Sequence, residues 1–300
     1  MKTIQASAPA RVTNILYLTD FSPTSEAALP FLIALGRGYG AKVHALHVLM
    51  PTPYPYTGPG LAAAALEAEE EDALAEMKRV GYRLESVHHE TTIQRGMDVW
   101  SAVEQAIQED HIDLIIVGTS GRTGTEKLLL GSVAEEIFRR SPVPVLTIGP
   151  GARSSFPNES RFSRILFATD FTPESLAASP YAISLAQQNR AHLDLLFVMP
   201  THEELNQHDT KLFEGTVAEA IQRLHEIVPK ETKFEFPPKA FVEYGEPAKR
   251  ISEVAGQRGS DLIALGIRHT THVGAATHLE GSVAHKVIVH APCAVLTVRS

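Results

Sequence analysis

The segment 117–138, VGTSGRTGTEKLLLGSVAEEIF, combines small residues and a hydroxyl at a spacing that suits anion binding. An apolar run ends at Gly118, Gly121 follows, and the pair Gly131-Ser132 precedes a helix-like sequence. Glycine lets main-chain N–H groups approach a ligand closely. The first turn of a helix adds unpaired N–H groups and a partial positive charge, which together stabilise a phosphate. The segment therefore indicates a phosphate-binding loop.

A structural interpretation of the same residues is also open. Glycines occur at many strand–helix turns that bind nothing, and Ser132 with Glu135 matches the capping box Ser-x-x-Glu. The loop lacks the Gly-Lys-Ser/Thr of a Walker loop, and no dinucleotide fingerprint follows the first expected strand. Taken alone, the glycine spacing is a weak indication of a phosphate site.

The sequence around this loop alternates between strand and helix patterns. Strands are expected at 14–20, 42–49, 88–96, 112–118 and 143–150, mostly as apolar runs of the kind buried on both faces. Helices are expected at 21–40, 61–84, 97–110 and 131–141. The alternation predicts an α/β fold, with a doubly wound, five-stranded parallel sheet and helices on both faces. Ligands of such sheets bind beyond the carboxyl ends of the strands.

The first expected helix carries signals at both ends. Ser22 is a favourable N-cap and Pro23 suits the first helical position. The helix is expected to end over Gly36, Gly38 and Gly40, because glycine favours helix ends.

The whole pattern occurs twice in the chain. ILYLTDFSPTSEAALP from Ile15 matches ILFATDFTPESLAASP from Ile165, and GSVAEEIFRRSPVPVLTI from Gly131 matches GSVAHKVIVHAPCAVLTV from Gly281. Two tandem domains of the same fold are therefore predicted. Their expected bounds are 11–150 and 164–300, joined by a polar linker at 151–163 that is rich in Gly, Pro and Ser.

Composition narrows the class of protein. The chain has 300 residues and a net charge of −8, which argues against a nucleic-acid partner because phosphate neutralisation needs clustered Lys and Arg. Cys293 is the single cysteine, so an intrachain disulfide is excluded, and we expect it to be a buried small residue. The first residues do not form a secretory signal, and the apolar runs are too short to span a bilayer. We expect a cytoplasmic protein with no membrane partner.

The repeated motifs resemble the universal stress protein family. LTDFS follows the first expected strand, and Gly-x2-Gly-x9-Gly-Ser follows the fourth, so the resemblance covers nearly the whole chain in two copies. In that family the glycine motif distinguishes ATP-binding members from non-binding members, and the first copy matches it throughout. The resemblance implies an adenine nucleotide as ligand, namely ATP, with ADP and AMP as alternatives. Mg²⁺ is an option, although no carboxylate is assigned to the phosphates.

Roles of the family are carried over to matching positions in the first copy. Asp20, beside Thr19, is expected near the adenine–ribose end, where a carboxylate accepts hydrogen bonds from ribose hydroxyls. The alternative for Asp20 is a plain turn or N-cap residue. Val48 is expected to contact adenine through its main chain. The residues expected to line the ribose are Val117 and Gly118, and those expected around the phosphates are Gly121, Arg122, Gly131, Ser132 and Val133.

The second copy departs from the motif. The equivalent positions are Asp170, Val198, Gly266, Gly281 and Ser282, but His269 replaces the second glycine and the loop is two residues longer. A side chain in place of that glycine obstructs a phosphate cradle, so we expect the second copy to bind nucleotide poorly or not at all. His269, His272, His278 and His285 also suggest a metal site, but their spacing fits no standard structural site and we favour a solvated loop.

The sequence is compatible with three functions. The favoured one is an ATP-binding regulatory protein of the stress response, with nucleotide held mainly by the first copy. The alternatives are a slow nucleotide hydrolase and an interaction module that ignores nucleotide. No general base is evident beside the loop, so no catalytic residue is assigned. A protein partner is expected but not specified.

The last strands of the two copies suggest how the copies meet. Members of the family commonly dimerise through these strands, so 143–150 and 293–300 are expected to pair antiparallel within one chain and form a pseudo-dimer. Association of two such chains into a homodimer is a further option.

Overall fold

The computed structural model describes residues 12–51, 59–119, 130–149, 151–152, 161–199, 216–268 and 282–299. The elements of the first half are β1 (Asn14–Leu18), α1 (Pro23–Glu26), α2 (Leu29–Tyr39), β2 (Lys42–Leu49), α3 (Pro59–Arg83), β3 (His89–Arg95), α4 (Val99–Glu109), β4 (Leu114–Gly118), α5 (Ser132–Arg140) and β5 (Val145–Ile148). Those of the second half are β6 (Arg164–Ala168), α6 (Pro173–Leu176), α7 (Ser179–Asn189), β7 (His192–Met199), α8 (Val217–Ile227), β8 (Lys239–Tyr244), α9 (Pro247–Arg258), β9 (Leu262–Ile267), α10 (Val283–His290) and β10 (Ala294–Arg299). The two halves repeat one element order.

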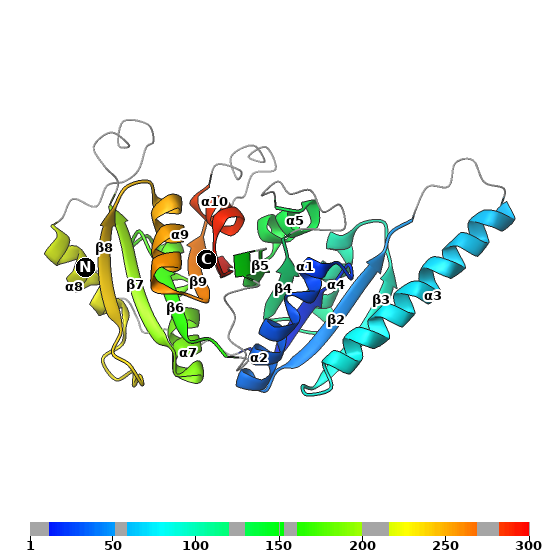
Figure 1. The fold of residues 1–300 in the computed structure, drawn as a ribbon, viewed down its shortest axis with the longest axis horizontal. Coiled ribbons are helices and arrows are strands. Elements are labelled where there is room, and N and C mark those ends of the chain that lie inside the picture. The colour runs from blue at the N-terminus through cyan, green and yellow to red at the C-terminus, as the bar shows by residue number, and fades with distance from the viewer. Residues whose placement is uncertain are drawn as a thin grey trace.

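The strands form one continuous ten-stranded sheet, in the order β3-β2-β1-β4-β5-β10-β9-β6-β7-β8. Neighbouring strands within each half are parallel, whereas β5 and β10 are antiparallel, with Thr147 opposite Val295 and Val145 opposite Thr297. In Figure 1 the C-terminus lies beside β5 in the middle of the molecule, and α3 runs along the outer edge beside β3. The expected pairing of the last strands within one chain is confirmed, and it fuses the two sheets into one.

Two hydrophobic cores cover the two faces of the sheet. On β1, Ile15 and Tyr17 point into the core beneath α2, α3, α7 and α8, while Leu16 and Leu18 point into the core beneath α4, α5, α9 and α10. Successive residues of a strand face opposite sides, so a strand covered on both faces must be apolar throughout. This explains the continuous apolar runs of the sequence and confirms the doubly wound arrangement.

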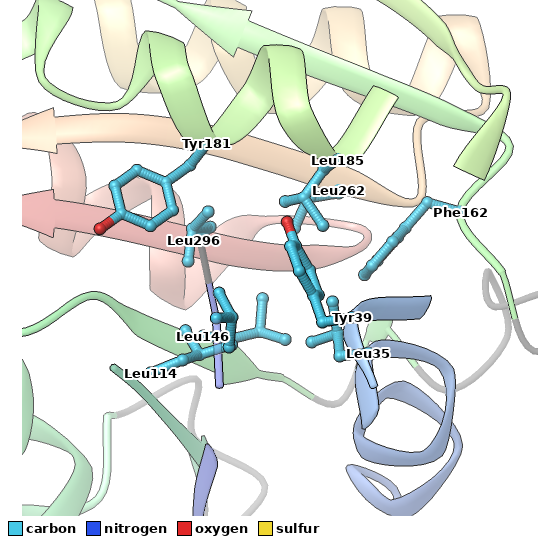
Figure 2. Close-up of a pocket in the computed structure, with 10 residues that line it drawn as sticks. Leu35, Tyr39, Leu114, Leu146, Phe162, Tyr181, Leu185, Leu262 and Leu296 are labelled. Carbon is cyan, nitrogen blue, oxygen red and sulfur yellow. The ribbon is translucent and has the colours of Figure 1, made fainter. Parts of the chain in front are cut away.

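The two halves are joined by hydrogen bonds between β5 and β10 and by apolar side chains beside that strand pair. Thr147 Oγ1 donates to the main-chain oxygen of Val295, and Thr297 Oγ1 donates to that of Val145, so the β5–β10 pair is tied reciprocally. Figure 2 shows the apolar seam beside this pair, lined by Leu35, Tyr39, Leu114, Leu146, Phe162, Tyr181, Leu185, Leu262 and Leu296. Phe162 lies at the end of the expected linker, yet it is buried here.

The segment expected as one helix at 21–40 forms two helices. Ser22 caps α1 by accepting from Ser25 N–H, and Pro23 is the first helical residue, as expected. The break falls just before Pro30, which lies in the first turn of α2. Proline has no N–H, and its ring would clash with the preceding turn if one helix continued from α1 into α2. The prediction that three glycines end the helix was wrong for two of them. Gly36 and Gly38 lie inside α2, and only Gly40, at φ 64°, ends it.

Candidate functional site

A pocket opens beyond the carboxyl ends of β1, β2 and β4, next to the first turn of α5. Its empty volume is about 770 Å³, including space open to solvent. The predicted site residues that line it are Thr19, Asp20, Val48, Val117, Gly118, Gly131, Ser132 and Val133. Gly121 and Arg122, the other two predicted residues, lie outside the described residues. The sheet therefore brings together residues that are far apart in the sequence.

Six further residues line the same pocket and were missed by the sequence analysis: Leu18, Ser25, Leu46, His47, Val99 and Ala134. His47 had a usable signal, because it is a polar residue near the carboxyl end of its strand, where ligands of such sheets bind. Ser25 had none, since its place in the pocket depends on how α1 turns back over the sheet.

The turn between β1 and α1 has an unusual main-chain conformation. Phe21 has φ 60°, a left-handed value that is uncommon for a bulky residue. Thr19 Oγ1 accepts from Phe21 N–H at 3.0 Å, and Asp20 Oδ1 accepts from Ser22 N–H at 3.0 Å, so both side chains hold the turn. The turn role foreseen as the alternative for Asp20 is confirmed. A ligand role for the same carboxylate stays a prediction.

His47 connects the second strand to this turn. Its side chain is buried, with Nδ1 2.7 Å from the main-chain oxygen of Thr19 and the ring 4.3 Å from the ring of Phe21, centroid to centroid. A carbonyl oxygen only accepts, so Nδ1 carries a proton and donates it. In the second half the register places Phe197 at the same position, and it packs against Phe171 at 4.9 Å. The hydrogen bond is thus a feature of the first half.

Gly118 has a packing role that is independent of any ligand. A Cβ added there would stand 3.0 Å from the main chain of Thr24 and Ser25, because α1 lies directly against the end of β4. At the equivalent Gly266 an added Cβ would overlap the main chain of Glu174. Both halves therefore need a glycine at this point for packing. The part of the glycine motif that is specific to a phosphate site consists of its later glycines.

The start of α5 differs from the prediction. The capping box of Ser132 and Glu135 is wrong: Gly131 is the N-cap, Ser132 is already helical, and no side chain caps the helix. In α10 the helix begins one residue later, so Ser282 is the N-cap and its hydroxyl accepts from His285 N–H at 3.2 Å. Ser132 instead lines the pocket, as the first residue of α5.

The electrostatics of the pocket come mainly from main-chain groups. The titratable residues among the described lining residues are Asp20 and His47, and no lysine or arginine is among them. The positive end of α5 is therefore the main attraction for an anion within the described part of the pocket. Below the pocket, burial raises the pKa of Tyr17 to about 12, so its hydroxyl remains a donor to the main-chain oxygen of Ser25 at 2.8 Å and holds α1 in place.

Other predicted features fall outside or away from this pocket. His269, His272, His278 and Gly281 lie outside the described residues, so the expectations for the second loop stay untested. Cys293 is 1% exposed, which confirms that it is a buried small residue. None of the helices in the described parts of the chain is both long and apolar enough to cross a bilayer.

Known proteins share both the sequence pattern and the fold. The sequence profile of the Universal stress protein family matches residues 11–149 and 161–299. Universal stress protein MJ0531 of Methanocaldococcus jannaschii is 33% identical over 139 residues, covering 45% of this chain and 81% of the relative. MJ0577 of the same organism is 30% identical over 152 residues, covering 45% and 93%.

Among solved structures, a universal stress protein from Archaeoglobus fulgidus DSM 4304 superposes with a TM-score of 0.73 at 21% identity, covering 95% of this chain and 98% of that one. Its likeness shows that the fold of the whole chain, both halves included, also occurs in that protein. The two profile matches together span most of the sequence. The chain therefore belongs to the universal stress protein family and carries the family's domain twice in tandem.

Proposed function

We propose that the first half binds an adenine nucleotide, with ATP as the favoured ligand, and that the bound nucleotide regulates the protein in a stress response. The main support is that eight residues predicted from sequence line one pocket, at the strand ends where ligands of such sheets bind. The start of α5 closes one side of this pocket and offers uncapped N–H groups to a phosphate. Neither feature depends on the residues outside the described ranges.

The proposed orientation of the nucleotide follows from the chemical groups on each side of the pocket. Asp20 at the end of β1 would accept hydrogen bonds from the ribose, and the main chain at Val48 would meet the adenine ring. Gly131, Ser132 and Val133 would surround the phosphates with amides and one hydroxyl. ADP and AMP fit the same scheme with fewer phosphate contacts, and Mg²⁺ would need phosphate oxygens and water as most of its ligands.

Binding is favoured over hydrolysis by the position of the titratable groups. Asp20 and His47 lie at the ends of β1 and β2, whereas the residues at the start of α5 that line the pocket carry no group that would activate a water molecule. His47 also uses Nδ1 to hold the Thr19 main chain. Slow hydrolysis remains the alternative activity, and a nucleotide-independent interaction module is the alternative without ligand.

For the second half we propose weak or no nucleotide binding. Phe197 occupies the position of His47, and the hydroxyl of Ser282 caps α10, whereas Ser132 makes no such cap and lines the pocket of the first half. These differences add to the histidine that replaces the second glycine of the motif. The second half would then have a structural role, in which β10 pairs with β5 of the nucleotide-binding half.

The proposal is tested on the purified full-length chain. Protein is denatured and the supernatant is analysed by mass spectrometry for released nucleotide, and apo protein is titrated with ATP, ADP and AMP by calorimetry. We expect close to one nucleotide per chain. Absence of binding at millimolar ATP would leave the interaction module as the better description. Phosphate release under single-turnover conditions then distinguishes a binding protein from a slow hydrolase.

A further inference from the structure

Three potential metal ligands meet at the end of the sheet opposite the nucleotide pocket. His44 lies near the start of β2, Glu90 near the start of β3, and Asp110 directly after α4. One ligand atom from each residue lies within 4.8 Å of the other two. The residues come from three elements, so the cluster exists only in the folded chain.

The orientation of the His44 ring is set by Asn14. The side-chain nitrogen of Asn14 donates to the main-chain oxygen of His111 at 3.3 Å, which turns its oxygen toward His44. His44 Nε2 lies 3.3 Å from that oxygen, so Nε2 carries a proton and donates it. The other ring nitrogen, Nδ1, is therefore the one that faces the carboxylates.

His44 Nδ1 is buried and faces the carboxylates of Glu90 and Asp110, both of which only accept hydrogen bonds when ionised. The side chain is 7% exposed, and Nδ1 lies 2.5 Å from Glu90 Oε1 and 3.6 Å from Asp110 Oδ2. The approach to Glu90 has the distance of an ion pair, which would require a protonated ring, but it lacks hydrogen-bond geometry, so within the described residues Nδ1 makes no well-formed hydrogen bond. A neutral ring would direct a lone pair at two negative groups, which is unfavourable in a buried place. A cation between the three groups removes the conflict.

We propose that His44 Nδ1, Glu90 and Asp110 bind a divalent first-row transition-metal ion, with Zn²⁺ as the best-suited member of that class. One imidazole nitrogen and two carboxylates are ordinary ligands of such ions, and the two negative charges balance the ion. Bonds of about 2.0–2.2 Å at tetrahedral angles separate ligand atoms by roughly 3.3–3.6 Å. The distance from Nδ1 to Asp110 already fits. Glu90 would have to move outward from its 2.5 Å contact with Nδ1, and its 42% exposed side chain has solvent-facing space for that shift.

The neighbours of the cluster resemble the outer shell of a metal site. Lys42 Nζ donates to Glu90 Oε2 at 2.6 Å, which leaves Oε1 for the ion, and this hydrogen bond lowers the pKa of Glu90 so that it stays ionised. Asn14 fixes the second nitrogen of His44. Metal-bound histidines are usually oriented in this way through their other ring nitrogen.

At the equivalent position of the second half, a buried carboxylate is paired with two arginines. The strand register places Asp194 at the position of His44 and Lys239 at that of Glu90. Asp194 is 1% exposed and pairs with Arg164 at 3.1 Å and with Arg258 at 2.5 Å. Guanidinium groups supply the positive charge there, whereas in the first half Lys42 pairs with the outer oxygen of Glu90, and no lysine or arginine among the described residues pairs with Asp110.

The experiment uses the full-length chain after chelator treatment, in a background where His269, His272 and His278 are changed to Gln to remove competing imidazoles. Zn²⁺ is titrated by calorimetry, and the imidazole nitrogens of His44 are followed by long-range ¹H–¹⁵N NMR. Loss of outer-shell partners alone weakens metal sites about 10- to 100-fold, so Asp110→Asn and Glu90→Gln are each expected to weaken binding at least about tenfold. Glu109→Gln changes an exposed carboxylate at the end of α4 and is the matched control, with unchanged affinity expected.

The expected result is one Zn²⁺ per chain and a large shift of the His44 Nδ1 resonance on binding. The inference is overturned if Asp110→Asn and Glu90→Gln bind Zn²⁺ as the parent does. It is equally overturned if Nδ1 carries a proton that Zn²⁺ does not displace, because His44 is then an imidazolium paired with the two carboxylates.

Discussion

His47 Nδ1 lies 2.7 Å from the main-chain oxygen of Thr19, so a side chain of β2 holds the turn that follows β1. The turn contains the left-handed Phe21, whose ring packs on His47, and it positions Asp20 at the rim of the pocket. A strained conformation of this kind persists only where its surroundings enforce it. The His47–Thr19 contact is one of the restraints that enforce it in the first half.

Replacing His47 by Phe, the residue of the second half, should keep the ring contact with Phe21 and remove the hydrogen bond to Thr19. We expect a loss of about 1–3 kcal/mol in the free energy of unfolding, because a buried acceptor loses its donor. Nucleotide affinity should fall as the turn loosens. Urea unfolding and calorimetry measure the two effects. Phe197→Leu is the control, since it should cost stability without changing nucleotide affinity.

Gly118→Ala and Gly131→Ala should separate packing from binding. At Gly118 the new Cβ meets the main chain of Thr24 and Ser25 at 3.0 Å, so we expect a loss of about 1–3 kcal/mol in stability from overpacking. Gly131 has φ −62°, which alanine adopts without strain, so its change should affect nucleotide affinity more than the urea midpoint. Equal losses of stability in both variants would contradict this assignment.

Ser132→Ala and Ser282→Ala form a matched pair at the starts of α5 and α10. Loss of a hydrogen bond to a charged group costs about 1.5–3 kcal/mol, so Ser132→Ala should weaken ATP binding by roughly 10- to 100-fold with little change in stability. Ser282→Ala removes a true N-cap and should cost about 1 kcal/mol of stability with ATP affinity unchanged. If both variants bind ATP like the parent, the Ser132 hydroxyl does not contact the ligand.

Asp261 gives a defined pH dependence of stability. It is 2% exposed, and burial raises its pKa from 3.8 to about 6, although hydrogen bonds from the N–H groups of Ser163 and Arg164 oppose the rise. The folded chain then binds this proton more tightly than the unfolded chain, so stability is lost as the pH rises from about 4 to about 6. Relative to Asp261→Asn, the parent should lose on the order of 3 kcal/mol across that window. Urea unfolding at pH 4 and pH 7 tests this, and a constant difference would refute it.

Cys293 should be unreactive in the native protein. Its side chain is 1% exposed, and burial raises the pKa of the thiol, so very little thiolate forms at neutral pH. We expect iodoacetamide to label it only as the chain unfolds in urea, with the same midpoint as the circular dichroism signal. Because the chain has a single cysteine, mass spectrometry reads this reaction directly. Rapid labelling without denaturant would show that β10 opens locally.

The local features of the fold were predictable because they depend on short stretches of sequence. The apolar runs at the strands, the Ser22 cap and the repeat at Ile15 and Ile165 are read within a few residues, and each was found as expected. The strand ends of a doubly wound sheet also indicated where a ligand would bind, so most of the pocket was identified. The two-helix break at Pro30 was missed because the apolar pattern continues across it.

Contacts between distant segments were decided only by the tertiary structure. Whether Ser132 caps α5 or lines a pocket depends on a shift of one residue in the helix start, and the sequence Gly-Ser is the same in both halves. The meeting of His44 with Glu90 and Asp110 depends on the strand register and on where α4 ends. The sequence by itself determined the two domains, their strands and the family, because periodicity and motifs are local. Packing determined which side chains share a site, since angstrom-scale distances arise only when the elements are assembled.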